Sequence, residues 1–308
     1  MPWLVFMSRL INLQMSKIMQ TPYVKFTKMH GCGNNYIYVW LPDMLKALDA
    51  EALSADELTT LLQQKAIEWS RQGFGIGSDG LITIEPSDVA DFRMRIFNND
   101  GSEAMMCGNG VRCCGKFVHD KGYMAELSQL RGKKLTDVVA FDTLAGTKVL
   151  QLFMDKNDMV ESVRVDMGIP ELQGSLRLTA LDREFSGAKV SMGNPHFVIV
   201  LDEDVETFDI AHYGAVLEKH EAFPDGCNIE FANILPDGNV RMRVWERGSG
   251  ITMACGTGAC ATAVALCAES VKIKMDGGTL KIDWDGEGEH LFMTGPAVTV
   301  FEGQMFGV

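Results

Sequence analysis

The chain has 308 residues, 46% of them hydrophobic, and a formal net charge of −13. This length allows one or two domains with a large core, and the acidic balance argues against nucleic acid or an anionic membrane as a partner. Since no apolar run approaches the ~20 residues of a membrane span, we do not expect a membrane protein either.

The first twenty residues differ from the rest of the chain. They contain four methionines and a short apolar patch at residues 2–7. The patch is short for the core of a signal peptide, and no basic residue precedes it, so we interpret residues 1–20 as an N-terminal extension. Met15 and Met19 are alternative starts. Free thiols and the lack of a signal together predict a cytoplasmic location.

The predicted first half consists mainly of strands. A β-prone entry and a strand flank a glycine-containing turn, and a segment with apolar residues at helical spacing follows. A glycine loop then leads into two further strands. In chain order, these elements are residues 23–28, 36–40, 55–70, 81–84 and 92–97.

The second half repeats this general order, with strands in the majority. Two further helices are predicted to start at the two cysteines described below. The remaining predicted elements are strands at residues 160–167, 197–201, 228–232, 240–245, 280–284, 291–294 and 298–301 and a helix at residues 210–220.

The motif Cys-Gly-x-Gly occurs twice. It begins at Cys107 and again at Cys255, 148 residues later, which is close to half of the chain. Each copy follows a polar run that contains glycine and leads into a segment with helical character. A repeat of this length is too long for a solenoid, so it indicates two related domains.

The chemistry of the motif depends on the position of the sulfur. At a helix N-terminus the unpaired N–H groups favour negative charge, so the pKa of each thiol is predicted to fall below ~8.5. Glycines in the first turn leave N–H groups open to a substrate carboxylate. Two thiols on opposite faces of one carbon are suited to inverting a stereocentre.

The other six cysteines are predicted to be small buried hydrophobic residues. No Cys-x-x-Cys pair and no finger-like histidine spacing occurs, so no metal site is predicted. These six are Cys32, Cys113, Cys114, Cys227, Cys260 and Cys267.

Five segments together resemble the diaminopimelate epimerase family, and the resemblance runs from about residue 26 to residue 308. It implies an α/β (α+β) fold of two pseudo-symmetric domains, each a curled, mostly antiparallel or mixed sheet around a central helix. We expect one domain at 21–155, completed by a strand at 297–308, and the other at 156–296. The segments are residues 28–34, 96–103, 107–112, 193–196 and 246–260.

The resemblance also implies an activity. Members of the family interconvert L,L- and meso-diaminopimelate in lysine and peptidoglycan-precursor synthesis, without a cofactor. We therefore expect a small-molecule substrate and no cofactor, and a homodimer is a further expectation.

The family's functional residues carry over onto matching positions. Cys107 and Cys255 would exchange the proton, while His196 and Glu246 would position the reacting end of the substrate. Arg247 suits a bidentate pair with the distal carboxylate. The remaining expected substrate contacts are Asn34, Gly80, Asn98, Gly108, Asn109, Asn194, Asn228, Gly256 and Thr257.

Two departures from the family pattern bear on substrate binding. The chain has Asn35-Tyr36 where the family often has Asp-Phe, and Gly80 where many members have Gln. One side-chain contact is therefore expected to be lost or replaced by backbone.

Two other classes stay open. A proline racemase uses two cysteines on the same fold, usually with His where this chain has Asn109, and a non-catalytic binding protein would keep the fold alone. Phenazine-type isomerases lack the cysteine pair. Asn109, and Arg247 beside Glu246, favour diaminopimelate.

Overall fold

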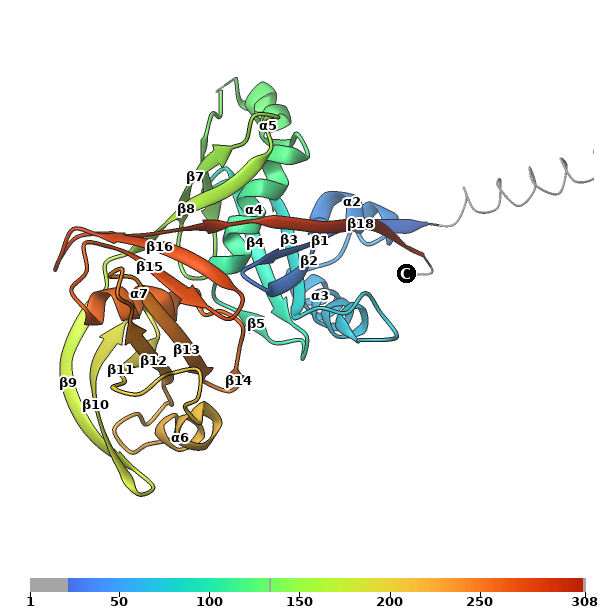
Figure 1. The fold of residues 1–308 in the computed structure, drawn as a ribbon. Helices are drawn as coiled ribbons and strands as arrows, with labels where there is room; N and C mark the ends of the chain where they lie inside the picture. The colour runs from blue at the N-terminus through green and yellow to red at the C-terminus, as the bar shows by residue number, and fades with distance from the viewer. Residues whose placement is uncertain (1–21, 133, 307–308) are drawn as a thin grey trace, which may run out of the picture.

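The computed structural model describes residues 22–132 and 134–306. The predicted extension at residues 1–20 lies outside this range. Strands dominate and form one continuous 18-stranded sheet. Figure 1 shows this sheet in two halves, each curled around one helix, α4 (Gly108–Asp120) in the first half and α7 (Gly256–Ala265) in the second. The predicted fold class is therefore confirmed.

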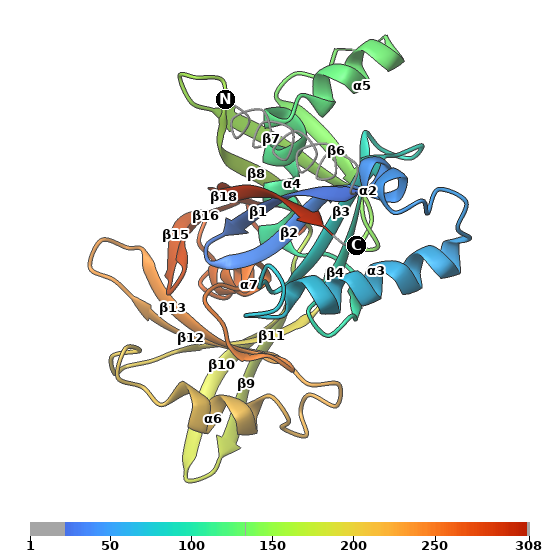
Figure 2. The same ribbon diagram turned by 90° about the vertical axis from the view of Figure 1, so that its right-hand side faces the viewer.

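The first half contains seven strands and is completed by the end of the chain. Strand β18 (Val298–Phe306) pairs antiparallel with β1, and the two run side by side in Figure 1. Helices α2 and α3 cover the outside of this half in Figure 2. The other elements are β1 (Tyr23–Gly31), β2 (Asn34–Trp40), α2 (Leu41–Ala47), α3 (Ala55–Ser70), β3 (Gly80–Pro86), β4 (Phe92–Asn98), β5 (Glu103–Ala104), α5 (Tyr123–Arg131), β6 (Val138–Asp142) and β7 (Lys148–Met154).

The second half surrounds α7 and carries α6 on its outside (Figure 2). Strand β8 (Val160–Gly168) pairs with both β7 and β17, so it joins the two halves of the sheet. The remaining elements are β9 (Glu171–Ala180), β10 (Arg183–Ser191), β11 (Pro195–Val200), α6 (Ile210–Leu217), β12 (Asn228–Ile234), β13 (Val240–Glu246), β14 (Gly250–Ile251), β15 (Ser270–Met275), β16 (Gly278–Trp284) and β17 (Leu291–Pro296).

The strand register repeats between the halves. Ile82 pairs with Ile96 between β3 and β4, and Glu230 pairs with Val244 between β12 and β13, at the same offset of 148 residues that separates the cysteines. The parallel pairing of β2 with β3 likewise matches that of β11 with β12. Positions around Cys107 and Cys255 can therefore be compared one to one.

Local sequence explains where the helices begin. Helix α3, predicted at residues 55–70, starts with a capping box in which Ser54 and Glu57 bond reciprocally. Helix α7 consists mainly of small residues and is almost entirely buried, since strands approach it closely from several sides. Helices α2 and α5 and the β9–β10 hairpin were not predicted. No helix in the described part of the chain is long and apolar enough to cross a membrane.

Candidate active site

Each motif cysteine caps one of the two central helices. Cys107 is the N-cap of α4 and its Sγ accepts from the Gly110 N–H at 3.4 Å; Cys255 is the N-cap of α7 and accepts from the Gly258 N–H at 3.4 Å. The backbone at both cysteines is extended, which turns each sulfur back over the first helical turn as in other N-caps. The predicted helix starts are confirmed.

The first turns of the two helices meet where the halves join. Asn109 Nδ2 donates to the Ala254 carbonyl at 3.2 Å. Met293 lies against both turns, because a Cβ on Gly108 would come within 2.8 Å of its Cε and a Cβ on Gly256 within 3.2 Å of its Sδ. The two glycines therefore allow both helices to approach the same methionine.

Glu246, at the end of β13, acts on both sulfurs. Its negative charge contributes to the raised pKa of Cys107 and to that of Cys255. Its carboxylate accepts from the Thr252 hydroxyl at 2.5 Å, and burial raises its own pKa. A single carboxylate thus lies near both thiols, which come from opposite halves of the chain.

The thiol pKa values differ from the sequence prediction. Burial raises the pKa of Cys107, although the Gly110 N–H pulls it down, and burial raises the pKa of Cys255 well above its ordinary value. The predicted lowering is therefore wrong for this structure. The cost of removing a thiolate from water exceeds the stabilisation by the N–H groups.

Five of the six cysteines outside the repeated motif are buried, as the sequence predicts. These five are Cys32, Cys113, Cys114, Cys227 and Cys260. Cys267 is exposed, so that prediction is wrong. It follows the end of α7 with a φ of 51°, and this left-handed conformation ends the helix at the surface.

His196 is fully buried, and both of its ring nitrogens have a partner. Nδ1 lies 2.7 Å from Glu230 Oε1, and Nε2 lies 3.1 Å from Asn194 Oδ1. Asn194 Nδ2 in turn donates to Thr257 Oγ1 at 3.4 Å, in the first turn of α7. The role of His196 stays a prediction, and these contacts favour positioning over direct contact with substrate.

Glu230 was missed by the sequence analysis. It is fully buried on β12, two residues after Asn228. The available signal was an acidic residue between Ile229 and Phe231 in a strongly apolar strand, since buried carboxylates normally have a partner.

The predicted amides of the first half gather beside Cys107. Asn34 Nδ2 donates to Cys107 Sγ at 3.5 Å, and the Tyr36 hydroxyl donates to Asn98 Oδ1 at 3.5 Å. A Cβ on Gly80 would lie only 2.8 Å from the Tyr36 ring. The phenol therefore occupies the space next to Gly80, a position that the sequence analysis did not foresee.

Arg247 and Asn228 lie together at the end of β12 and β13. Asn228 Oδ1 accepts from the Arg247 backbone N–H at 3.0 Å, and its Nδ2 donates to the Pro195 carbonyl at 3.1 Å. The Arg247 side chain is exposed, and its Nη1 donates to the Asp225 carbonyl at 3.0 Å. Asn228 thus positions the backbone that carries Arg247.

Arg112 was also missed. It is fully buried, and it donates to Asn109 Oδ1 at 2.7 Å, to the Gly108 carbonyl at 3.3 Å and to the Pro296 carbonyl at 3.2 Å. A charged residue within the mostly apolar run 111–118 was the available signal. Arg112 and the Ala254 carbonyl therefore occupy the side-chain amide of Asn109.

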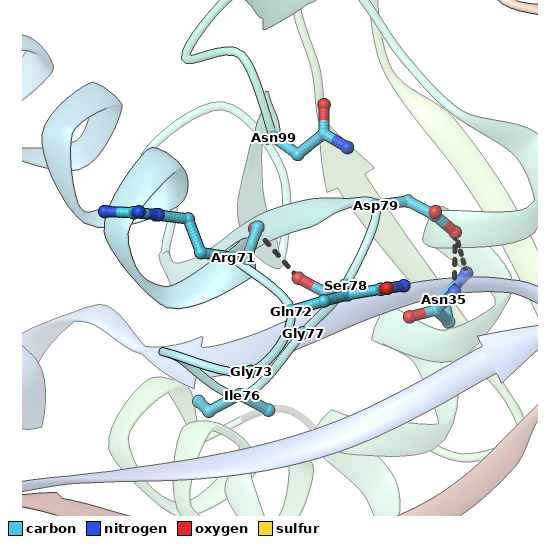
Figure 3. Close-up of a pocket in the computed structure, with 10 residues that line it drawn as sticks. Asn35, Arg71, Gln72, Gly73, Ile76, Gly77, Ser78, Asp79 and Asn99 are labelled. Atoms are coloured by element: carbon cyan, nitrogen blue, oxygen red, sulfur yellow. Dashed lines mark hydrogen bonds between the residues drawn. The ribbon is translucent and has the colours of Figure 1, made fainter.

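A polar cavity of about 550 Å³ lies beside the strand ends (Figure 3). Asn35 donates to Asp79 from its backbone N–H at 2.8 Å and from Nδ2 at 2.7 Å, as Figure 3 shows. None of the predicted site residues lines it. The lining residues are Asn35, Ser70, Arg71, Gln72, Gly73, Ile76, Gly77, Ser78, Asp79 and Asn99.

A family model described as diaminopimelate epimerase matches residues 26–173 and 188–300. This chain belongs to the diaminopimelate epimerase family. The diaminopimelate epimerase of Bacteroides thetaiotaomicron is 49% identical over 296 residues, which cover 93% of this chain and 100% of that protein. That of Methanococcus maripaludis strain C6 is 44% identical over 302 residues, covering 92% and 99%.

Solved structures show how far the epimerase fold extends. A probable proline racemase from Agrobacterium radiobacter K84 has a TM-score of 0.67 at 15% identity and covers 92% of this chain and 93% of that chain. At this identity the likeness concerns the fold alone.

Proposed function

We propose that this protein interconverts L,L- and meso-diaminopimelate without a cofactor, with Cys107 and Cys255 as the two bases. Family membership supports the reaction. The observation that carries the roles is the pair of equivalently placed cysteines. Each caps a helix, the two helices touch through Asn109, and the charge of Glu246 acts on both thiols.

The chemistry requires one thiolate and one thiol. The thiolate removes the weakly acidic α-hydrogen as a proton, and the thiol on the opposite face supplies another. Charge that spreads into the substrate carboxylate would be stabilised by N–H groups in the two first turns. These belong to Gly108, Asn109, Gly256 and Thr257.

The remaining residues hold the two ends of the substrate. Glu246 lies close enough to both thiols to receive the ammonium group of the reacting end. Arg247, exposed beside it, presents its guanidinium to the distal carboxylate. The amides nearest these groups supply hydrogen bonds, and His196 holds Asn194 in place. These amides are Asn34, Asn98, Asn194 and Asn228, with Gly80 against the Tyr36 ring.

Exchange of the α-hydrogen in heavy water tests this proposal. L,L-diaminopimelate should incorporate deuterium at Cα and yield the meso isomer, whereas proline under the same conditions should do neither. Exchange of proline but not of diaminopimelate would favour the racemase alternative. Binding of diaminopimelate without any exchange would favour a binding protein and overturn the proposal.

We also propose a cytoplasmic homodimer with domains at 21–155 plus 297–308 and at 156–296. Strand β18 supports self-association, since it exposes Val298, Val300 and Phe301 on the strand that completes the first half. Sedimentation equilibrium of the full chain should give twice the chain mass, and a monomer at micromolar concentration would contradict the dimer.

A further inference from the structure

The buried carboxylate of Glu230 lies close to the sulfur of Cys255, next to Gly258. Glu230 Oε1 lies 2.6 Å from the point where a Cβ on Gly258 would stand, and Cys255 Sγ is 3.3 Å from the same point. The oxygen and the sulfur are therefore no farther apart than these two distances combined. Glu230 is fully buried, and its Oε2 has no hydrogen-bond partner among the described residues. Its Oε1 also lies 2.7 Å from His196 Nδ1, so the carboxylate is held beside the sulfur of Cys255 in a buried environment, where charges interact strongly.

The equivalent position behind Cys107 holds a hydrocarbon. Ile82 in β3 has the same place in the register as Glu230 in β12. Its Cδ1 lies 2.9 Å from where a Cβ on Gly110 would stand, and Cys107 Cβ lies 3.4 Å from that point. The first half therefore places a methyl group where the second half places a carboxylate.

The two central helices differ in positive charge, which is present in α4 and absent at the equivalent position in α7. The buried guanidinium of Arg112 donates to the Gly108 carbonyl at 3.3 Å and to Asn109 Oδ1 at 2.7 Å, both in the first turn of α4. The equivalent residue in α7 is Cys260. A positive charge thus lies beside the turn that Cys107 caps, and a neutral thiol lies beside the turn that Cys255 caps.

We infer that the proton shared by the two thiols rests on Cys255 and that Cys107 is the thiolate with which the reaction begins. A nearby carboxylate disfavours a thiolate and a nearby guanidinium favours it. Glu230 and Arg112 are then positioning residues that set the direction of the pair. The inference rests on the proposed function and adds to it which base is charged.

The other titratable groups near the sulfurs leave this order in place. Burial raises the pKa of Tyr36 and of Cys113, so both are neutral near pH 7. Glu246 raises the pKa of both thiols, and at Cys255 it does so more than Glu230, so it does not favour a thiolate there. The groups concerned are Tyr36, Cys113 and Glu246 near Cys107, and His196 and Glu246 near Cys255.

The thiol pKa values agree with the geometry. Burial raises that of Cys107, and the Gly110 N–H and the Arg112 charge oppose the rise. Burial raises that of Cys255 well above its ordinary value, and the charges of Glu246 and then Glu230 add to it. The apparent values belong to the coupled pair, so single-thiol variants are needed to separate them.

One turnover exchanges the protonation states of the two cysteines. The Cys107 thiolate takes the α-hydrogen as a proton, and the Cys255 thiol gives its proton to the opposite face of the carbon. After this turnover Cys107 carries the proton and Cys255 carries the charge. The enzyme then returns to rest when Cys107 releases its proton to water and Cys255 takes one up.

Ultraviolet titration of the thiolate in single-thiol variants tests the inference without substrate. Cys255→Ser leaves Cys107, Cys107→Ser leaves Cys255, and the double variant gives the background of the other cysteines. Cys107 should titrate on the order of one pH unit below Cys255, which is a tenfold difference in proton affinity.

Glu230→Gln keeps the size of the side chain and removes its charge. In the Cys107→Ser protein it should move the titration of Cys255 to lower pH, and in the Cys255→Ser protein it should leave Cys107 nearly unchanged. Glu218→Gln is the matched control, because Glu218 is a buried carboxylate of the same half whose oxygens accept from Trp245 Nε1 and the Gly248 N–H. This control substitution should leave the titration of both thiols unchanged.

Two outcomes would overturn the inference. One is that Cys255 titrates at or below the pH of Cys107, a comparison that holds even if Glu230→Gln fails to fold. The other is an equal shift of both thiols in Glu230→Gln. Either result would leave the epimerase proposal intact, since deuterium exchange at Cα tests that separately.

Discussion

Around Cys107 the first half places Asn34, Tyr36 and Asn98, whereas the matching positions around Cys255 hold Asn194, His196 and Glu246. The backbone is the same in both places, down to the N–H group three residues after each cysteine. The side chains differ in hydrogen bonding and in charge. A repeated fold thus places two cysteines at equivalent helix starts, and the flanking side chains of the two halves have diverged.

Removing either sulfur should have the largest effect on activity, and it tests whether both halves contribute a base. Cys107→Ala and Cys255→Ala should each lower epimerisation on the order of 10³-fold or more, because each removes one partner of the proton exchange. Thermal unfolding should change much less than activity, since each change removes only one sulfur and one N-cap hydrogen bond. Near-normal turnover by either variant would show that one thiol suffices.

Replacing Arg247 tests whether the second half binds the distal carboxylate of the substrate. Its counterpart in the first half is Asn99, so only one half supplies a guanidinium at this position. Arg247→Lys should cost about 2–4 kcal/mol in kcat/KM, or about 30- to 1000-fold, because the bidentate geometry is lost while the charge stays. The loss should appear mainly in KM.

Alkylation provides the control for Arg247→Lys. Cys107 and Cys255 should react with iodoacetamide as in the parent, which would show that the thiol pair is intact. If the variant turned over diaminopimelate as well as the parent, the assigned role of Arg247 would be wrong.

A smaller effect concerns the pH dependence of stability. Burial raises the pKa of Glu246 above its unfolded value, so the folded state binds more protons than the unfolded state between the two values. The contribution of Glu246 to stability is therefore present at low pH and is lost as pH rises through the folded pKa. Glu246→Gln lacks this titration.

Chemical denaturation of the two proteins measures that difference. The free energy of unfolding of the parent minus that of Glu246→Gln should fall as the pH is raised from about 4.3, the ordinary pKa of a free glutamate side chain, towards neutrality. A difference that rises over the same range would mean that the carboxylate is stabilised, not destabilised, by its surroundings.

The smallest expected effect is that of replacing Tyr36. This residue occupies, in the first half, the position that His196 occupies in the second half. Its hydroxyl reaches Asn98 at 3.5 Å, a long bond, so Tyr36→Phe should cost about 0.5–1 kcal/mol in the free energy of unfolding. Tyr38→Phe is the matched control on the same face of β2, where the hydroxyl bonds the Gly110 carbonyl at 3.3 Å. A loss of activity larger in Tyr36→Phe than in Tyr38→Phe would indicate that the Tyr36 hydroxyl also contacts substrate.

The sequence predicted much of the framework. Helix α3 was predicted with its observed bounds, because its apolar spacing and its Ser54 cap are local properties. The β9–β10 hairpin was missed, although Leu176, Leu178 and Ala180 alternate with polar residues, because the first half of β9 is exposed and carries little apolar signal. Helix α2 was missed too, although Pro42 stands in its first turn.

The sequence by itself determined the two cysteines, their helix starts and the family, because a repeated motif and helix capping are written in neighbouring residues. Only the tertiary structure decided the charges around them. Glu230 lies far along the chain from Cys255, and Arg112, although it follows Cys107 closely, reaches its partners only because the strands bury it. The balance between burial and hydrogen bonds that sets each thiol pKa likewise depends on which strands cover the thiol. The reason is that desolvation and Coulomb energy depend on distances between packed side chains, and such distances are fixed only when the two halves close on each other.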